Sequence, residues 1–151
     1  MSIGRWGVWF SPNAIPIQDL ARLAEEVEGH GYDILWYPEA MAYEAMSLGS
    51  YLLGRTRKLM LASGIANIYA RDAAAAMQGH NTLNAIYGGR FILGLGVSHI
   101  PIVKGARGHN YGKPLSAMRT YLEGMYAAPV QVKAPKRQVV LAALGPKMLA
   151  L

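Results

Sequence analysis

The sequence predicts an α/β protein built on a parallel sheet. Strand-like apolar segments alternate with helix-like segments along all 151 residues, which is the pattern of parallel strands joined by helical crossovers. The strand segments are nearly continuous apolar runs, as expected for strands that helices cover. Hydrophobic residues make up 52% of the chain and charged residues 16%, which favours a folded protein over a disordered one. We therefore expect one domain, residues 1–151, with about five β/α units.

The first half of the chain contains two predicted strand–helix units. The strands are expected at Arg5–Phe10 and Tyr32–Tyr37, and the helices at Gln18–His30 and Glu44–Gly54. In both helices, apolar residues recur at three- and four-residue spacing and so share one face. Glycines at positions 29 and 31 provide a stop signal for the first helix.

The second half continues the same alternation. The remaining elements are a strand at Leu59–Ala66, a helix at Ala73–Tyr87, a strand at Phe91–Leu95, a helix from Pro114 to about Tyr126, and a strand at Gln138–Leu144. Asp72 stands where an N-cap would, and Pro114 suits the first turn of a helix. A long loop, Gly96–Lys113, follows the fourth strand, and Gly145-Pro146-Lys147 opens a final helix.

Two architectures share this alternation, an open doubly wound sheet and a closed eight-stranded barrel. A barrel takes about 250 residues, whereas an open five-stranded sheet fits this length but normally ends in a complete covering helix. The sequence stops one turn into a helix, at Met148–Leu151. We therefore expect the chain to be truncated.

Composition excludes several classes of protein. The chain has no cysteine, so it has neither disulfides nor a thiolate metal site. His30, His80 and His109 lack the spacing of metal ligands, and no metal is expected. The sequence has neither a membrane-length apolar run nor a signal peptide, so the expectation is a cytoplasmic protein without a membrane partner.

The positive charge raises the question of nucleic-acid binding. The formal net charge is +6, but the basic residues are spread over segments 55–58, 104–113 and 133–137. No aromatic stacking pattern or known binding motif accompanies them. We therefore expect a solvated basic surface and no nucleic-acid partner, with an anionic small ligand as a further option.

The predicted strand ends carry the residues suited to a ligand. They are Trp9-Phe10, Pro38-Glu39, Gly64–Asn67, Gly96–His99 and Ala143–Gly145. Aromatic and apolar groups alternate there with small residues, which suits a planar ring lying against backbone. A helix opening at Pro146 would add an N-terminus able to hold a phosphate. The dinucleotide fingerprint that begins at Gly94 fails, because His99 occupies its third glycine position and no helix opens there.

Three runs give the sequence a family resemblance. Ser63–Asp72, Gly89–His99 and Ala142–Met148 resemble the bacterial luciferase-like oxidoreductases, in particular the branch that uses the deazaflavin coenzyme F-420. The resemblance implies an eight-stranded (β/α)8 TIM barrel, of which this chain is an incomplete N-terminal part. It also implies hydride transfer between coenzyme F-420 and a small organic substrate. The alternatives are an FMN-dependent monooxygenase of the same superfamily and an inactive truncated fragment, and a homodimer is possible.

The resemblance also assigns roles to residues. It implies a non-prolyl cis peptide at Gly64-Ile65 behind the coenzyme ring, with Asn67 near the ring edge. Glu39 and His99 occupy acid–base positions. The expected coenzyme-binding residues are Gly64, Ile65, Ala66, Asn67, Gly96, Val97, Ser98, Leu144, Gly145 and Pro146.

Simpler interpretations stand beside these roles. His99 is alternatively a hydrogen-bonded loop residue, and Glu39 a cap for the segment that follows it. Asn67 and Ser98 are alternatively turn residues that satisfy local backbone groups. Arg71 is expected either to bind substrate or to pair with its neighbour Asp72 on the surface.

Overall fold

The computed structural model describes residues 6–136 and 138–151. Arg5, where the first strand was expected to begin, and Arg137, in the last basic segment, lie outside the described residues. Every strand pair in the described chain is parallel, in the order β1-β2-β3-β5, and both β4 and β6 pair with β5. The strands are β1 Gly7–Trp9, β2 Ile34–Tyr37, β3 Met60–Ser63, β4 Ala66–Asn67, β5 Phe91–Gly96 and β6 Val139–Leu141.

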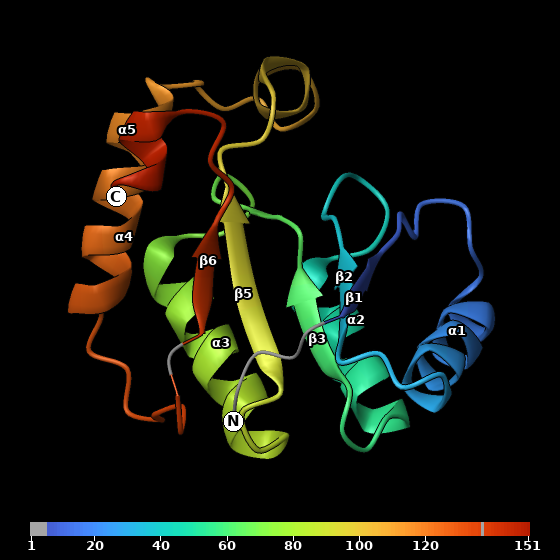
Figure 1. Ribbon diagram of the computed structural model, residues 1–151. Helices are drawn as coiled ribbons and strands as arrows, with labels where there is room; N and C mark the ends of the chain where they lie inside the picture. The colour runs from blue at the N-terminus through green and yellow to red at the C-terminus, as the bar shows by residue number, and fades with distance from the viewer. Residues whose placement is uncertain (1–5, 137) are drawn as a thin grey trace.

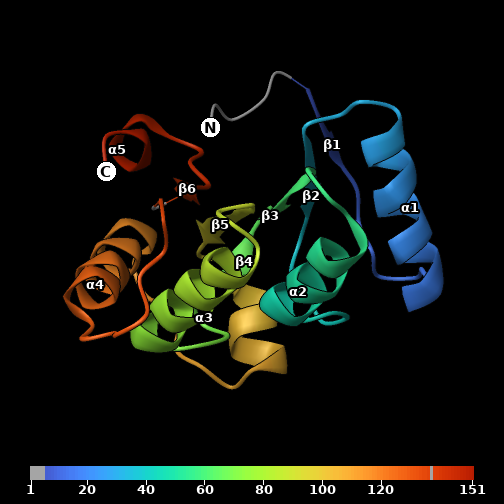
Figure 2. The same ribbon diagram turned by 90° about the horizontal axis from the view of Figure 1, so that it is seen from below.

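Helices connect successive strands except β3 and β4, and the longer helices lie on one face of the sheet. They are α1 Ile17–Gly29, α2 Ala45–Arg55, α3 Ala73–Ile86, a π-helix at Pro101–Ala106, α4 Pro114–Ala127 and α5 Pro146–Leu149. Figures 1 and 2 show the strands along an arc, with α1 to α4 outside it. A doubly wound sheet would carry helices on both faces, so this arrangement is that of part of a barrel. Among the described residues, no helix is long and apolar enough to cross a membrane.

The core has two layers of unequal size. The larger cluster lies between the sheet and the helices and includes Leu35, Leu61 and Leu93, all fully buried. The smaller cluster faces the inside of the arc and consists of Ile34, Met60, Ala62 and Ile92 packed with Trp36. Alternate residues of the same strands therefore serve both faces, which explains why the strands are apolar throughout.

Two helices, α2 and α3, begin at acidic capping residues. The carboxylate of Asp72 accepts a hydrogen bond from the Ala75 amide at 2.8 Å and caps α3, as the sequence predicted. Glu44, predicted as the first residue of its helix, is instead the N-cap of α2 and accepts the amides of Met46 and Ser47.

Three predicted boundaries were wrong. The expected strand Leu59–Ala66 is interrupted after Ser63 and resumes as β4. The loop Gly96–Lys113 contains the π-helix, which the glycines in that segment obscured. The last strand ends at Leu141, so Leu144 lies outside the sheet and is fully exposed.

Candidate functional site at the carboxyl ends of the strands

A bulge between β3 and β4 dominates the carboxyl end of the sheet. Ala62 pairs with Ile92 and Ala66 pairs with Leu95, so the β3–β4 strand contains one residue more than β5 over this stretch. The Gly64–Ile65 peptide bond within the bulge is cis, at the position that the family resemblance implied.

The neighbouring strand makes room for this bulge with two glycines. A Cβ on Gly94 would lie 1.9 Å from the carbonyl oxygen of Ser63, and one on Gly96 would lie 2.5 Å from Cγ1 of Ile65. The Ser63 hydroxyl also closes the gap that the bulge leaves in the ladder, because it accepts from the Gly94 amide and donates to the Gly94 carbonyl, both at 2.9 Å. The bulge and these glycines therefore form one unit.

Two tryptophans flank the bulge. The indole nitrogen of Trp9 donates to the Gly64 carbonyl at 3.1 Å, and the Trp9 side chain is otherwise exposed. Trp36 is next to Gly64, since a Cβ on that glycine would contact its ring at 3.4 Å. Aromatic surface beside bare backbone is the arrangement expected for a planar ligand.

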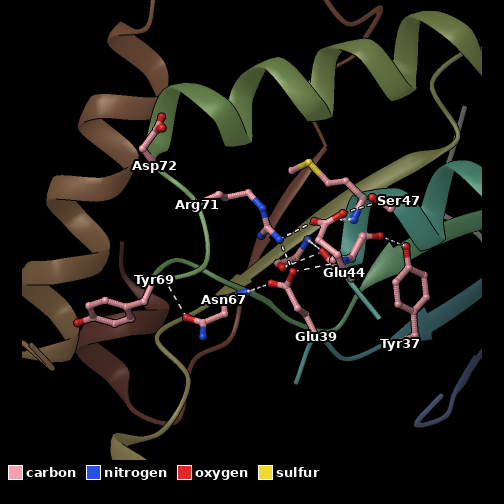
Figure 3. Close-up of polar contacts among 12 residues, drawn as sticks. Tyr37, Glu39, Glu44, Ser47, Asn67, Tyr69, Arg71 and Asp72 are labelled. Carbon is pink, nitrogen blue, oxygen red and sulfur yellow. Dashed lines mark hydrogen bonds and ion pairs between the residues drawn. The ribbon is translucent and has the colours of Figure 1, made fainter. Parts of the chain in front are cut away.

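Glu39 holds the far side of the bulge. Its carboxylate is buried and accepts the amide of Asn67 at 2.8 Å and that of Ala45 at 3.2 Å. Its own amide donates to the Ile65 carbonyl at 2.9 Å. Glu39 does therefore contact the start of the next helix, as the simpler interpretation expected, but it also binds the bulge (Figure 3).

Arg71 neutralises this carboxylate. Its Nη2 forms ion pairs with Glu39 and, at 2.6 Å, with Glu44. Burial would lower the pKa of Arg71, but the hydrogen bond and charge of Glu39, together with Glu44, outweigh it and raise that pKa. Burial likewise opposes ionisation of Glu44, but hydrogen bonds from Ser47 and Met46 and the charge of Arg71 lower its pKa.

Asn67 is a further buried polar residue of this site. It is fully buried, and its Oδ1 accepts the Tyr69 amide at 2.9 Å. Its Nδ2 is buried without a hydrogen-bond partner, as is Nη1 of Arg71. Figure 3 shows the Asn67 side-chain amide directed away from Arg71. Buried donors are nearly always satisfied in proteins, so an unsatisfied one at a strand end points to a ligand.

The structure brings some of the predicted residues together and leaves others apart. Gly64, Ile65, Asn67 and Gly96 meet at the bulge. The side chain of Ala66 belongs to the larger core cluster, and that of Val97 packs against it. Ser98 has a φ of 56°, a conformation that non-glycine residues use sparingly and often at sites.

The remaining predicted residues lie away from the bulge. His99 is exposed, and its carbonyl accepts the amides of Ile102 and Val103 at the start of the π-helix. The described contacts include none between His99 and Glu39. Leu144 and Pro146 are exposed, and α5, which Gly145 caps, has four residues. The segment expected at the phosphate is therefore present only as the first turn of a helix.

The sequence analysis predicted neither the inward pairing of Arg71 with Glu39 nor the contact of Arg71 with Glu44. Arg71 was expected to contact substrate or to pair with Asp72 on the surface, but its side chain turns inward to Glu39 while Asp72 caps α3. The signal was available: a glutamate directly after an apolar strand would be buried and would need a cation from a neighbouring loop. Arg71 is in the loop after β4, at the same end of the sheet.

Known proteins resemble this chain over nearly its whole length. Residues 3–151 match the family model for luciferase-like monooxygenase. The chain is 32% identical to Rv3520c of Mycobacterium tuberculosis, named as a coenzyme F-420-dependent oxidoreductase, over 82% of this chain and 34% of that protein. It is 30% identical to 5,10-methylenetetrahydromethanopterin reductase of Methanolobus tindarius, over 97% of this chain and 50% of that protein. The chain thus spans a third to a half of these relatives, at their N-terminal end.

Solved structures confirm the fold. An F-420-dependent secondary alcohol dehydrogenase, in complex with an F-420–acetone adduct, matches with a TM-score of 0.81 at 16% identity, over 95% of this chain and 53% of that one. The oxygenating constituent of 3,6-diketocamphane monooxygenase from Pseudomonas putida, in complex with FMN, matches with a TM-score of 0.70 at 18% identity, over 80% of this chain and 38% of that one.

Proposed function

The chain belongs to the luciferase-like monooxygenase family, and on that premise we propose that it forms one side of the coenzyme site of an oxidoreductase. We call this side the coenzyme wall; it consists of the bulge at Gly64–Asn67 with Trp9, Trp36 and Glu39 around it. The enzyme would move a hydride between coenzyme F-420 and a small organic substrate. The observation that carries the proposal is the bulge at Gly64–Asn67, with bare backbone, two tryptophans and a buried free donor at one strand end. The relatives named for coenzyme F-420 support this coenzyme over FMN.

The residues fit a planar tricyclic ring. The cis Gly64–Ile65 segment would lie behind the ring, and Nδ2 of Asn67 would donate to a carbonyl oxygen at its edge. Gly96, Val97 and Ser98 would contribute backbone contacts on the adjacent strand. Segment 144–146 would lie toward the phosphate. When bound, the deazaflavin supplies the hydride chemistry, so this chain's task is to orient the ring and manage a proton.

His99 is the residue of this chain that we propose for proton transfer. An imidazole can act as a general acid or base, and His99 is exposed just after the end of β5. Glu39 is less suited to that role than the sequence suggested, because Arg71 and two backbone amides already occupy its carboxylate. We therefore keep His99 as the acid–base candidate and treat Glu39 as part of the wall.

An FMN-dependent monooxygenase is the second candidate. The likeness to the FMN-bound monooxygenase structure favours it, because the same fold accepts that coenzyme. The bulge and the Asn67 donor suit an isoalloxazine ring as well as a deazaflavin, since the two rings share their carbonyl edge.

Fluorescence titration with F-420 and with FMN tests the proposal. Two proteins are titrated: the chain itself, and a chimera in which the C-terminal half of the Methanolobus tindarius reductase continues it. We expect the chimera to bind F-420 more tightly than FMN. Binding of FMN alone, with oxygen consumption, would favour the monooxygenase, and no binding of either coenzyme by the chimera would refute both candidates.

A further inference from the structure

We propose that Arg71 is a positioning residue that fixes the bulge at Gly64–Asn67 through Glu39. The part of this inference that concerns the coenzyme rests on the proposed function. The part that concerns the wall itself rests on contacts within the chain and is tested separately.

Glu39 holds the bulge from both sides. Its amide donates to the Ile65 carbonyl at 2.9 Å, and its carboxylate accepts the Asn67 amide at 2.8 Å. The same carboxylate accepts the Ala45 amide at 3.2 Å. One residue at the end of β2 therefore connects the bulge to the first turn of α2.

The buried carboxylate of Glu39 needs a cation to compensate its charge. Its side chain is only 3% exposed, and two neutral amides do not compensate a buried negative charge. Arg71, itself 11% exposed, supplies that charge. Glu44 then balances the arginine from the outside, with its own side chain 45% exposed. Arg71 therefore bridges the buried Glu39 and the more exposed Glu44 (Figure 3).

The contacts of Glu39 with the bulge also orient Nδ2 of Asn67, the donor proposed to contact the ligand. Asn67 has its amide on Glu39 and its Oδ1 on the Tyr69 amide, so its backbone and its side-chain orientation are both set. What remains is Nδ2, a buried donor without a partner. Arg71 therefore determines, through Glu39 and the Asn67 backbone, where this donor points.

The loop that carries Arg71 has other attachments that survive removal of its side chain. The Tyr121 hydroxyl contacts the carbonyl oxygens of Arg71 and Asp72 at 3.2 and 3.3 Å. The Tyr69 hydroxyl accepts the Gly112 amide at 3.1 Å. Arg71→Met should therefore release the carboxylate and leave the loop in place.

We call the attachment of the bulge and α2 to Glu39, with Arg71 holding the Glu39 carboxylate, the clamp. Residue-resolved amide hydrogen exchange on the full chain tests it directly. In Arg71→Met we expect the amides of Asn67 and Ala45 to exchange at least about tenfold faster, because their acceptor is no longer held. The Leu59 amide, which Glu28 accepts at 2.7 Å, is the internal control and should not change. Arg55→Met removes a comparable but exposed pair with Glu25 and should change none of these amides.

Coenzyme titration of the chimera tests the positioning role. We expect Arg71→Met to weaken F-420 binding about tenfold and Arg71→Lys, which keeps the charge, to recover part of that loss. If Arg71 acts through Asn67, then Asn67→Ala combined with Arg71→Met should bind no more weakly than the weaker single variant. Additive losses would overturn the proposal.

The outcomes are separable. Unchanged exchange at Asn67 and Ala45, or equal acceleration at Leu59, overturns the clamp. Faster local exchange with unaltered binding overturns the positioning role alone. Absence of coenzyme binding by the unmodified chimera refutes the proposed function, while the exchange data still decide the clamp. Should Arg71→Met fail to fold, Arg71→Lys is measured in the same way, and the same local pattern is expected with smaller changes.

Discussion

The two ends of the sheet each hold a glutamate that accepts backbone amides. Among the described residues of these two clusters, the buried donors without a partner are at one end. At the amino end, Glu28 accepts the amides of Arg57, Lys58 and Leu59. Arg90 donates there to the carbonyls of Leu53 and Leu59 and to Thr56. Both Nη1 and Nη2 of Arg90 therefore have acceptors within the protein.

The carboxyl end uses the same chemistry less completely. Glu39 and Arg71 are paired there, yet Nη1 of Arg71 and Nδ2 of Asn67 are buried without partners. Before β6, Oε1 of Gln138 is also buried without a partner, but it is an acceptor. Between the Glu28–Arg90 cluster and the Glu39–Arg71 cluster, the buried donors without partners are in the second, at the carboxyl end. In barrels of this type the amino end serves stability and the carboxyl end binds ligands, and the distribution of unused donors matches that division.

Two fully buried asparagines provide the strongest test of this comparison. Asn84, at the amino end, bonds the amide and carbonyl of Phe91 and the carbonyl of His80 at 2.9–3.0 Å. Among the described residues, the Asn67 side chain has one hydrogen bond, to the Tyr69 amide. We expect Asn84→Ala to lower the free energy of unfolding by about 3 kcal/mol and Asn67→Ala by about 1 kcal/mol. Urea denaturation measures both.

The same two variants should separate in the opposite order in coenzyme binding. Asn67→Ala in the chimera should weaken F-420 binding by about tenfold, since one buried hydrogen bond is lost, and Asn84→Ala should leave it unchanged at a temperature where the protein is folded. Equal losses of stability would mean that the two ends do not differ in the way described.

The amino-end carboxylate gives a smaller, pH-dependent effect. Burial raises the pKa of Glu28, but hydrogen bonds from Lys58, Leu59 and Arg57, and then the charge of Arg90, outweigh burial and lower it. A lowered pKa in the folded state stabilises the fold above the unfolded-state pKa, and this contribution is lost as pH falls through the folded-state pKa.

We therefore expect Glu28→Gln to cost about 1 kcal/mol of unfolding free energy at pH 7, a value reduced for the partial exposure of the side chain. The difference from the unmodified chain should shrink below the ordinary glutamate pKa of about 4.3. Thermal melts at pH 7 and at acidic pH measure it. Glu25→Gln, in an exposed pair with Arg55, is the control and should show little of either effect.

The sequence predicted the order of the elements better than the detailed contacts at the carboxyl end of the sheet. Strand and helix order, the Asp72 cap and the parallel topology follow from periodicity and capping residues, which are local signals. The family resemblance located the cis bond at Gly64–Ile65. Periodicity alone placed an unbroken strand there, because the residues before and after the bulge are equally buried.

Ion pairs across distant segments were beyond local signals. Glu39 and Arg71 are 32 positions apart, and their meeting depends on the bulge that brings Asn67 under the Glu39 carboxylate. From the sequence alone, an exposed pair with its neighbour Asp72 is sufficient to explain Arg71. Only the burial of both partners in the folded chain favours the inward pair.

The smallest expected effect distinguishes the Arg71 side chain from the loop that carries it. Tyr121, on α4, contacts the carbonyls of Arg71 and Asp72, and burial raises its pKa to about 12. Its hydroxyl therefore stays protonated as a donor across the range in which the protein would work. We expect Tyr121→Phe to cost about 0.5–1 kcal/mol in urea denaturation, because two long hydrogen bonds to partly exposed carbonyls are exchanged for water. The exchange rate of the Asn67 amide should not change. If Tyr121→Phe accelerated exchange of that amide as much as Arg71→Met does, the coenzyme wall would depend on attachment of the loop in general. Arg71 would then have no specific role in positioning the Asn67 donor, and the two ends of the sheet would not differ in this respect.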